Sequence, residues 1–519
     1  MCVEYFASRV RPRLVSLLLA ACVAPGVSAV VACGDPADDP REDEIAGVIA
    51  EADLAVIRAR PALAAGKYVR MSTAPLGFMR GSLALYRHDA RSGSSQLSVS
   101  RFGLDVPLVP SLGDPHVENF GVLRASDGTL AIEPNDFDAA DRAPYLWDVR
   151  RLVSSMALSA LTANDDDPAA RAVTAASARD IARATAVGYR AAIERAAAGA
   201  PPERVTPATA PGSTLLTDAF SRSERDEAIR RDLTDLTDLS GTSRRLKRGV
   251  VDPTDTQNVF ADLAPFAYAS LPQAVAEWRR TLLAPPPESE LVLLDAVREM
   301  GSGVSSWPRV RLVLLVRGPT DAPDDDVLLE LKELADSGIA GLYPPGVHHD
   351  DVGLRIVETS REAWARPDAA PLWGVTRWVG LPCQIRVETQ GQKNIRISRM
   401  VGARGTPAAL AELGTVLGSI LGRVHTSGRD GTTNARAVFA RIVTDPEGFL
   451  DEQADAGVAY ATQTVADHAR FWRSLDRRGL SLGVPRDPSD APRPDFAAIL
   501  GTPPPPLRLP PLSPLPPLP

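Results

Sequence analysis

Residues 112–121 read LGDPHVENFG, a stretch that gathers oxygen-bearing and imidazole side chains between apolar flanks. A second acidic stretch, EPNDFDAAD at 133–141, follows a turn at Asp127-Gly128 and a short predicted strand. Together the two stretches carry Asp114, His116, Glu118, Asn119, Asp136 and Asp138. Carboxylate and amide oxygens suit Mg²⁺, and a carboxylate beside a hydroxyl can orient it and accept its proton. The pattern therefore favours a site for Mg²⁺ and a hydroxyl group, although Asp- and Asn-capped turns would use the same residue types.

A glycine-containing loop and a lysine indicate that phosphate could bind as well. The sequence predicts strands at 291–300, 309–318 and 327–334, with GSGVSS at 301–306 between the first two. Backbone N–H groups of such a loop can approach phosphates, and this role is predicted for Gly301, Ser302 and Gly303. Lys332 is predicted to face phosphate oxygens with Glu358 as its partner, as a lysine and a helix glutamate do in protein kinases. The alternative is an ordinary loop and a lysine at an exposed strand edge.

Helical patterns surround this strand-rich segment. A first amphipathic helix is predicted at 43–64, and residues 145–285 are predicted to be mostly helical. Thr406-Pro407 opens a further helix with a cap residue followed by proline, and its apolar stripe continues to His425. Another helix is predicted at 457–479.

Both ends of the chain differ from its body. Three arginines precede an uncharged stretch at 14–33 that is typical of an export signal. Cys33, and alternatively Cys22, resembles the lipid-modified cysteine of bacterial lipoproteins, which predicts a membrane-anchored protein of the cell envelope. An ordinary cleaved signal or an unused one, with a cytoplasmic protein, is the alternative. The proline-rich tail at 491–519 predicts an extended spacer or a ligand for a proline-binding module.

Length and composition exclude some classes of protein. A chain of 519 residues is long enough for two or three domains. Its net charge of -8 argues against a nucleic-acid partner, because such proteins usually carry a basic domain or stripe. Beyond Cys33 only Cys383 remains, so the body of the chain has no disulfide framework.

Several motifs resemble an uncharacterised bacterial family, domain of unknown function 2252. The resemblance rests on GDPHVENFG, on NDFDAADRAPYLWDVRRL at 135–152 and on KYVRMSTAPLGFMRGS at 67–82. The glycine loop, LELKE and LGRVHTSG at 421–428 also look like segments of that family. The resemblance covers about residues 60–430, but the family has no established activity.

The same motifs are similar to those of the aminoglycoside phosphotransferase and choline kinase group. The resemblance implies that Asp114 is a catalytic base assisted by His116, and that Asn119, Asp136 and Asp138 are Mg²⁺ ligands. It also implies that Asp148 steadies the catalytic loop, and Arg80 is predicted to support the site. Leu112 stands where that group carries a histidine.

The order of the motifs is reversed relative to kinases, since the catalytic-loop motif precedes the glycine loop. A helix that ends at His425 lies late in the chain, where a circularly permuted kinase would have it. The expected fold is therefore α+β and protein-kinase-like, with a circularly permuted chain that forms two lobes, one mainly helical and one a small antiparallel sheet. The expected parts are a signal peptide at 1–33, a helical lobe from 34–285 and 401–490, a small antiparallel-sheet lobe at 286–400, and the tail.

Three functions fit these expectations. The first is an Mg²⁺- and ATP-dependent phosphotransferase that acts on a hydroxyl of a small molecule or an envelope component. The second is a hydrolase that holds metal ions between Asp114, His116, Asp136 and Asp138. The third is a non-enzymatic envelope lipoprotein on a degenerate kinase-like scaffold. Export argues against the first, because ATP is scarce outside the cytoplasm.

Overall fold

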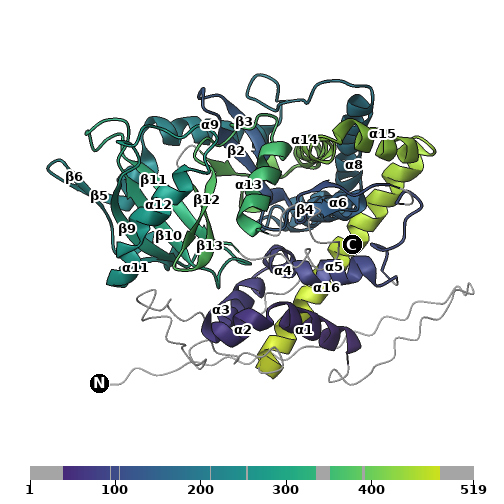
Figure 1. Cartoon of the computed structure of the whole chain (residues 1–519). Coiled ribbons are helices and arrows are strands. Elements are labelled where there is room, and N and C mark those ends of the chain that lie inside the picture. Colours follow the sequence, from purple (N-terminus) through teal and green to yellow (C-terminus); the bar gives the residue numbers. More distant parts are fainter. Residues whose placement is uncertain are drawn as a thin grey trace, which may run out of the picture. The chain divides into compact units, whose positions relative to one another are not determined.

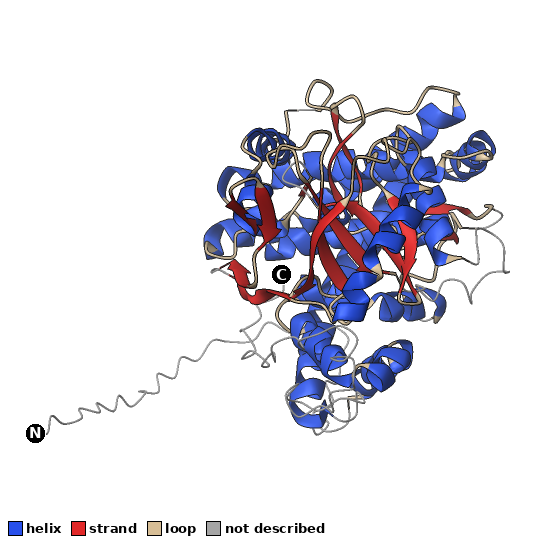
Figure 2. Cartoon of the chain, turned by 60° about the vertical axis from the view of Figure 1, so that its left-hand side comes forward, coloured by secondary structure: helices blue, strands red, loops and turns tan. Residues whose placement is uncertain are grey.

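The computed structural model describes residues 39–93, 95–103, 106–210, 212–252, 255–334, 351–388 and 392–479 (Figure 1). These residues form both helices and strands, which confirms an α+β protein (Figure 2). The predicted lipidation cysteines and the proline-rich tail lie outside the described residues. Within the described part of the chain, the helices are too short or too polar to cross a membrane.

A seven-stranded antiparallel sheet forms the β-rich part, in the order β12-β13-β11-β10-β9-β8-β7. The strands are β7 (Gly249–Asp252), β8 (Asp255–Ala261), β9 (Leu293–Met300), β10 (Arg311–Val316), β11 (Val327–Glu333), β12 (Gly374–Trp378) and β13 (Leu381–Val387). The three strands predicted around the glycine loop are thus confirmed as β9, β10 and β11. Helices α11 (Pro265–Ala269) and α12 (Leu271–Arg279) cover one face, where the indole N–H groups of Trp278 and Trp378 each find a backbone carbonyl.

The prediction that residues 145–285 are mostly helical is wrong for residues 237–261. This segment forms β5 (Thr237–Ser240), β6 (Ser243–Leu246), β7 and β8. Its strands are short, and they gain their order from long-range partners, since β8 pairs with β9 and the backbone of Leu246 donates to Asp295. The spacing of apolar residues within a short segment does not indicate such long-range pairing. The β-rich part therefore begins near residue 237 and not at 286.

Helices of varied length form the second part of the structure. They are α6 (Tyr145–Thr162), α7 (Pro168–Ala176), α8 (Ala178–Ala197), α9 (Thr214–Ala228), α10 (Arg231–Leu236), α13 (Val352–Ala363), α14 (Pro407–His425), α15 (Gly431–Ile442) and α16 (Pro446–Arg478). The helix predicted to open at Thr406 is confirmed, because the Thr406 hydroxyl accepts from the backbone N–H of Ala409. Short helical turns η2 (Ile397–Arg399) and η3 (Gly402–Gly405) lead into it.

Helices α8 and α14 approach closely because glycines line their contact. A Cβ at Gly418 would lie 2.0 Å from the carbonyl oxygen of Thr185. Gly414 and Gly422 on the same stripe also face α8. Small residues at this spacing let two helix backbones pack without side chains between them.

We therefore expect Gly418→Ala to lower the free energy of unfolding by about 1–3 kcal/mol, the usual cost of overpacking. The clash outweighs the roughly 1 kcal/mol that alanine gains over glycine in a helix. Gly47→Ala is the matched control, since Gly47 is exposed on a helix and a Cβ there meets nothing within 4 Å. Urea unfolding of both variants checks this, and equal stability of the two would contradict the packing.

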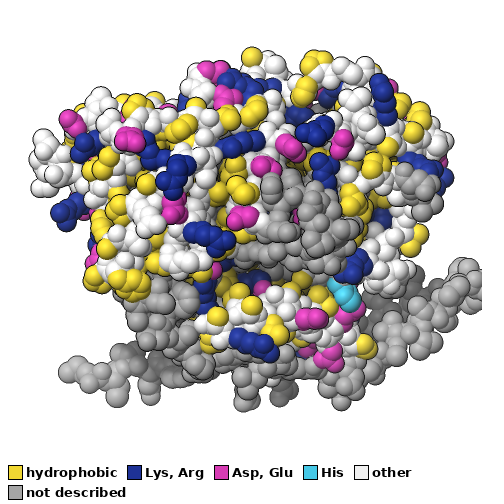
Figure 3. Space-filling model, viewed as in Figure 1, with side chains coloured by type: hydrophobic (Ala, Val, Ile, Leu, Met, Phe, Trp, Pro, Cys, Tyr) yellow, Lys and Arg dark blue, Asp and Glu magenta, His cyan; other side chains and the backbone are white. Residues whose placement is uncertain are grey.

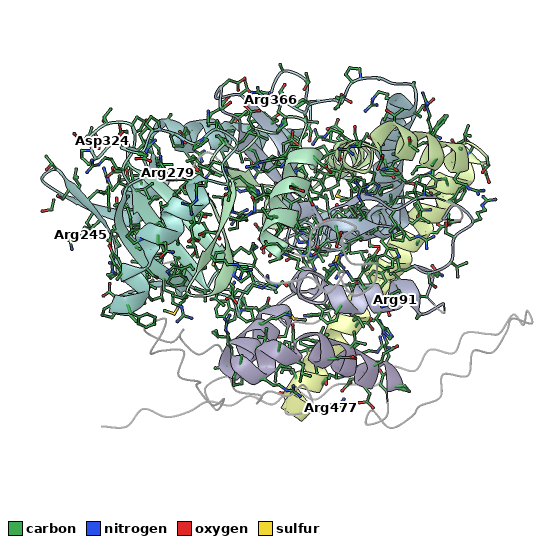
Figure 4. All side chains as sticks on the ribbon, in the orientation of Figure 1. Arg91, Arg245, Arg279, Asp324, Arg366 and Arg477 are labelled. Carbon is green, nitrogen blue, oxygen red and sulfur yellow. The ribbon has the colours of Figure 1, made fainter. Side chains whose placement is uncertain are left out.

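The predicted helix at 43–64 is instead three helices, α1 (Pro40–Ala52), α2 (Leu54–Ala59) and α3 (Pro61–Met71). Pro61 lacks the N–H that a continuous helix needs, so the chain turns at Arg60 and a new helix starts. In Figure 1, α16 runs from beside α15 to these helices. There Phe471 packs on Tyr68, and Arg477, labelled in Figure 4, donates to Glu42 of α1.

A small second sheet positions the acidic loops. It contains β2 (Phe120–Arg124), β3 (Leu130–Pro134) and β14 (Lys393–Asn394), and a separate pair joins β1 (Val109–Ser111) to β4 (Asp141–Ala143). Because Phe120 lies opposite Pro134 in the antiparallel ladder, the loop before β2 and the loop after β3 emerge at the same end. Helices α4 (Pro75–Gly81) and α5 (Leu83–Arg91) and the turn η1 (Val117–Asn119) complete the described elements.

Candidate functional site

Residues from three distant segments meet around one cavity of about 290 Å³. The predicted residues that line it are Arg80, Asp114, His116, Asn119, Asp136, Asp138 and Lys332. The acidic loops reach it from the ends of β2 and β3, and Lys332 reaches it from β11. The loop between β9 and β10 closes one side through residues 304–309.

The loop that carries Asp114 has a fixed conformation. Gly113 adopts a φ of 73°, and a Cβ there would lie 2.0 Å from the carbonyl oxygen of Ala139. Only glycine allows both that backbone geometry and the close contact between the two acidic loops. The side-chain amide of Asn119 donates to the carbonyl oxygen of Asp114 at 2.8 Å, which ties the two ends of the loop together.

Arg151 of α6 contacts the carboxylate of Asp114. Its Nε donates to Oδ1 of Asp114 at 2.8 Å, and its Nη2 donates to the carbonyl oxygen of Met79. Burial raises the pKa of Asp114 to about 6, although the positive charge of Arg151 opposes the rise. A carboxylate with this pKa is well placed to accept a proton near neutral pH. Arg151 was not among the predicted site residues.

The carboxylate of Asp148 holds the start of the loop that carries Asp114. Its carboxylate accepts hydrogen bonds from the backbone N–H groups of Leu112 and Gly113 at 2.7 and 3.1 Å, and from the hydroxyl of Ser111 at 2.8 Å. His425, at the end of α14, lies 3.3 Å from the same carboxylate through Nε2. The loop is therefore anchored through its backbone, and leucine at 112 does not remove that support.

Asp136 and Asp138 face two cations. The ammonium group of Lys332 lies 2.7 Å from Asp138 and 3.8 Å from Asp136, and Arg309 lies 3.6 Å from Asp138. Burial works against ionisation of Asp138, but Lys332 and Arg309 outweigh it and lower the pKa of this carboxyl below its usual value. The side chain of Asp136 is 39% exposed, so it is open to the cavity.

An arginine bridge explains why these residues meet. Arg386 of β13 donates to Glu330 of β11 at 2.6 Å and to the backbone carbonyl of Asn135 at 2.9 Å. It thereby holds the acidic loop after β3 against the strand that carries Lys332. Nothing in the local sequence around Arg386 signals this contact, because its partners lie far away along the chain.

The predicted pairing of Lys332 with Glu358 is wrong. Glu358 is exposed on α13, and it is not among the residues that line the cavity. Helix α13 buries Ile356 and Val357 against the helical core, and this orientation turns Glu358 outward. Asp138 takes the place of the glutamate partner.

The predicted role of the glycines at 301 and 303 also needs correction. Gly301 and Gly303 have positive φ values of 96° and 80°, as expected for a tight turn. However, Gly301 and Ser302 line a separate space of about 10 Å³, room for about one water molecule. The carbonyl of Gly301 instead accepts from Arg70 of α3. Ser305, Ser306 and Arg309 of the same loop face the main cavity.

His116 is buried with an unsatisfied nitrogen. Its side chain lines the cavity, and its Nδ1 has no hydrogen-bond partner among the residues that the structure describes. Burial, together with the charges of Arg80 and Arg151, lowers the pKa of His116 well below its usual value, so the ring is neutral. A buried polar group without a partner is costly, which favours a role in contacting a ligand.

Residues of helices α1 to α4 form one wall of the cavity. This wall is aliphatic at Ile49 and Val56, and it carries an ion pair in which Lys67 contacts Asp53 at 2.6 Å. Arg80 also lines the cavity, where it pairs with Glu118 at 2.6 Å. The wall is joined to the sheet by Arg60, which donates through two nitrogens to Glu333, the residue after Lys332. Apart from Arg80 of α4, sequence patterns had not linked these helices to the site.

The donor set fits a cation that shares its coordination with a ligand. No group of three or more histidine, cysteine or acidic side chains in the described ranges is arranged to hold a metal ion. Asp136, Asp138 and Asn119 nevertheless present oxygens to one cavity beside Lys332 and Arg309. Mg²⁺ is commonly held by one or two carboxylates, with phosphate oxygens and water completing its shell. On the face shown in Figure 3, acidic and basic side chains are interspersed.

Comparison with known proteins adds a family. The profile of a family described as an uncharacterized protein conserved in bacteria, DUF2252, matches residues 58–474. The match spans most of the chain and includes every residue named above that lines the cavity, apart from Ile49, Asp53 and Val56. No curated protein and no solved structure shows significant similarity to this chain.

Proposed function

The chain belongs to the DUF2252 family, and we propose that it is an Mg²⁺-dependent phosphotransferase that acts on a hydroxyl group. The observation that carries the proposal is the meeting of Lys332 with Asp136 and Asp138 in the cavity that Asp114 and Asn119 also line. These residues come from motifs more than a hundred positions apart, and their types are those that phosphoryl transfer requires.

Each residue then has a role. Asp114 accepts the proton of the attacking hydroxyl, and Asn119 and Asp136 hold Mg²⁺ with Asp138 beside them. Lys332 and Arg309 bind phosphate oxygens, and neutral His116 contacts the substrate. Mg²⁺ and ATP, when bound, supply charge neutralisation and the transferred phosphoryl group. The acceptor is a small molecule or a component of the cell envelope, in keeping with the predicted export signal.

The proposed fold is a circularly permuted protein-kinase-like one. Support comes from the end of α14, where His425 lies 3.3 Å from Asp148, the residue that holds the Asp114 loop. The late helix therefore reaches the early loop, as a permuted order of elements requires. The β-rich part with Lys332 lies between them in the sequence.

Calorimetric titration of ATP with Mg²⁺ into the full chain tests the proposal. We expect binding in the micromolar range that Asp136→Asn and Lys332→Ala each abolish, because the first removes a carboxylate that holds Mg²⁺ and the second removes a cation that contacts the triphosphate. Asp127→Asn is the matched control, since Asp127 lies at the other end of the β2–β3 hairpin and pairs there with Arg366. It should bind as the unaltered chain does.

Two results would favour one of the alternative functions. A folded protein that binds neither Mg²⁺ nor nucleotide would favour the non-enzymatic envelope scaffold. Hydrolysis of a phosphoester without ATP would favour the metal-dependent hydrolase.

A further inference from the structure

The acidic side chains of the cavity are already neutralised by the protein's own cations. Lys332 and Arg309 come from different elements, β11 and the loop before β10, yet both contact the carboxylate of Asp138. The side chain of Lys332 is 7% exposed and that of Arg309 is 19% exposed. Both cationic side chains would therefore stay largely enclosed if another ligand took the carboxylate of Asp138 from them.

A divalent cation alone meets an obstacle here. To bind Asp136 and Asp138 it must displace Lys332 and Arg309, which would then be two enclosed positive charges next to a third. Charges of like sign at short distance in a poorly hydrated site repel strongly. Binding of the cation alone is therefore weak.

An anion alone meets the opposite obstacle. Phosphate groups that reach Lys332 and Arg309 approach the carboxylates of Asp114, Asp136 and Asp138 at the same time. If cation and anion enter together, the cation takes the carboxylates and the anion takes the released ammonium and guanidinium groups. Every charge then keeps a partner.

We infer that this site binds a divalent cation and a polyphosphate chain only as a pair, by exchanging the Lys332–Asp138 and Arg309–Asp138 ion pairs for contacts to both ligands. This inference rests on the proposed function and deepens it, because it defines the donor by its phosphoanhydride chain. A phosphoanhydride chain suits the site better than one phosphate, because oxygens of neighbouring phosphates can complete the shell of the divalent cation while others contact Lys332 and Arg309.

The polyphosphate could belong to a nucleotide or be inorganic. Among the described residues that line the cavity there is no phenylalanine, tyrosine or tryptophan on which a base could stack. Aliphatic side chains such as Leu112 and Val304 are present, and these can also contact a base. The shared chemistry is the phosphoanhydride chain, and ATP and tripolyphosphate are compared as its two sources.

Mn²⁺ binding to the full chain measures the exchange. Water proton relaxation separates free Mn²⁺, the Mn²⁺–polyphosphate complex and the ternary complex with protein. We expect Mn²⁺ to bind the unaltered chain at least about 10-fold more tightly when tripolyphosphate or ATP is present, within the usual range of coupling between two ligands. Equal affinity with and without polyphosphate overturns the inference.

Lys332→Gln makes the test specific. Without the ammonium group the carboxylates are open, so this variant should bind Mn²⁺ alone about 10-fold more tightly than the unaltered chain and should lose the coupling. Arg309→Gln should also tighten the binding of Mn²⁺ alone and reduce the coupling. Both changes should be smaller than in Lys332→Gln, because Arg309 lies farther from Asp138. Lys393→Gln is the matched control, because Lys393 pairs with Asp226 outside the cavity, and it should leave Mn²⁺ binding unchanged.

Circular dichroism establishes that each variant is folded before binding is measured. If neither Lys332→Gln nor Arg309→Gln tightens Mn²⁺ binding, the inference is overturned. Equal coupling with ATP and with tripolyphosphate supports the inference and identifies the phosphoanhydride chain alone as the ligand. Coupling with ATP but not with tripolyphosphate also supports the inference and adds recognition of the nucleoside. Coupling without any phosphoryl transfer would sink the proposed function alone, and transfer without coupling would sink this inference alone.

Discussion

Asp114→Asn is expected to lower the rate of phosphoryl transfer by about 10²- to 10⁴-fold, the usual contribution of a general base. The substitution keeps the size of the side chain and removes only its ability to accept a proton. Asparagine can still accept from Nε of Arg151, so the loop should keep its position. The measurement is ADP release at saturating ATP and Mg²⁺, with nucleotide affinity determined in parallel. A loss of affinity equal to the loss of rate would assign Asp114 to binding.

The dependence of this rate on pH is a second test of the role of Asp114. Because the pKa of Asp114 is raised to about 6, the carboxylate is ionised above that pH and protonated below it. Activity should therefore rise as the pH increases through about 6 and fall as the pH drops below it. Arg151→Gln removes the positive charge that favours ionisation, so its rate profile should move to higher pH. Asp114→Asn should show no such step.

The sequence alone predicted which residues line this cavity better than it predicted the contacts between them. Asp114, Asn119 and Asp136 could be predicted because each lies on a short loop whose residue types and spacing are local properties. The same holds for Lys332, since β9, β10 and β11 have clear apolar runs. Arg151 and Arg309 could not be predicted, because their partners in the site lie far away along the sequence and arginines are common in this chain.

The errors have a common origin. Glu358 was chosen as the partner of Lys332 by its place on the next helix, but the rotation of α13 depends on which of its faces packs on the core. Strands β5 to β8 were missed because their order comes from pairing with β9 and from Asp295. The break at Pro61 was visible in the sequence, yet the apolar spacing on both sides of it favoured one continuous helix.

Asp148→Ala should be the most destabilising substitution in the site. The carboxylate of Asp148 is almost fully buried, and it accepts from Ser111, Leu112 and Gly113. Removing it leaves buried donors without an acceptor, and we expect a loss of about 3–5 kcal/mol in the free energy of unfolding. Asp180→Ala is the matched control, because Asp180 also lies in the first turn of a long helix but is exposed.

The control separates the loss of the Asp148 hydrogen bonds from the loss of a negative charge near a helix N-terminus. An exposed carboxylate in a first turn contributes about 0.3–1 kcal/mol, so Asp180→Ala should change the urea midpoint only slightly. If Asp148→Ala were no worse than Asp180→Ala, the loop would not depend on these bonds. In Asp148→Asn the amide can still accept through its oxygen, but its NH₂ group faces either Ser111 and the N–H of Gly113 or His425 and the N–H of Leu112. This variant should therefore fold and bind Mn²⁺ with polyphosphate, yet transfer phosphate slowly, because the misplaced loop moves Asp114 and leaves the ion-pair site intact.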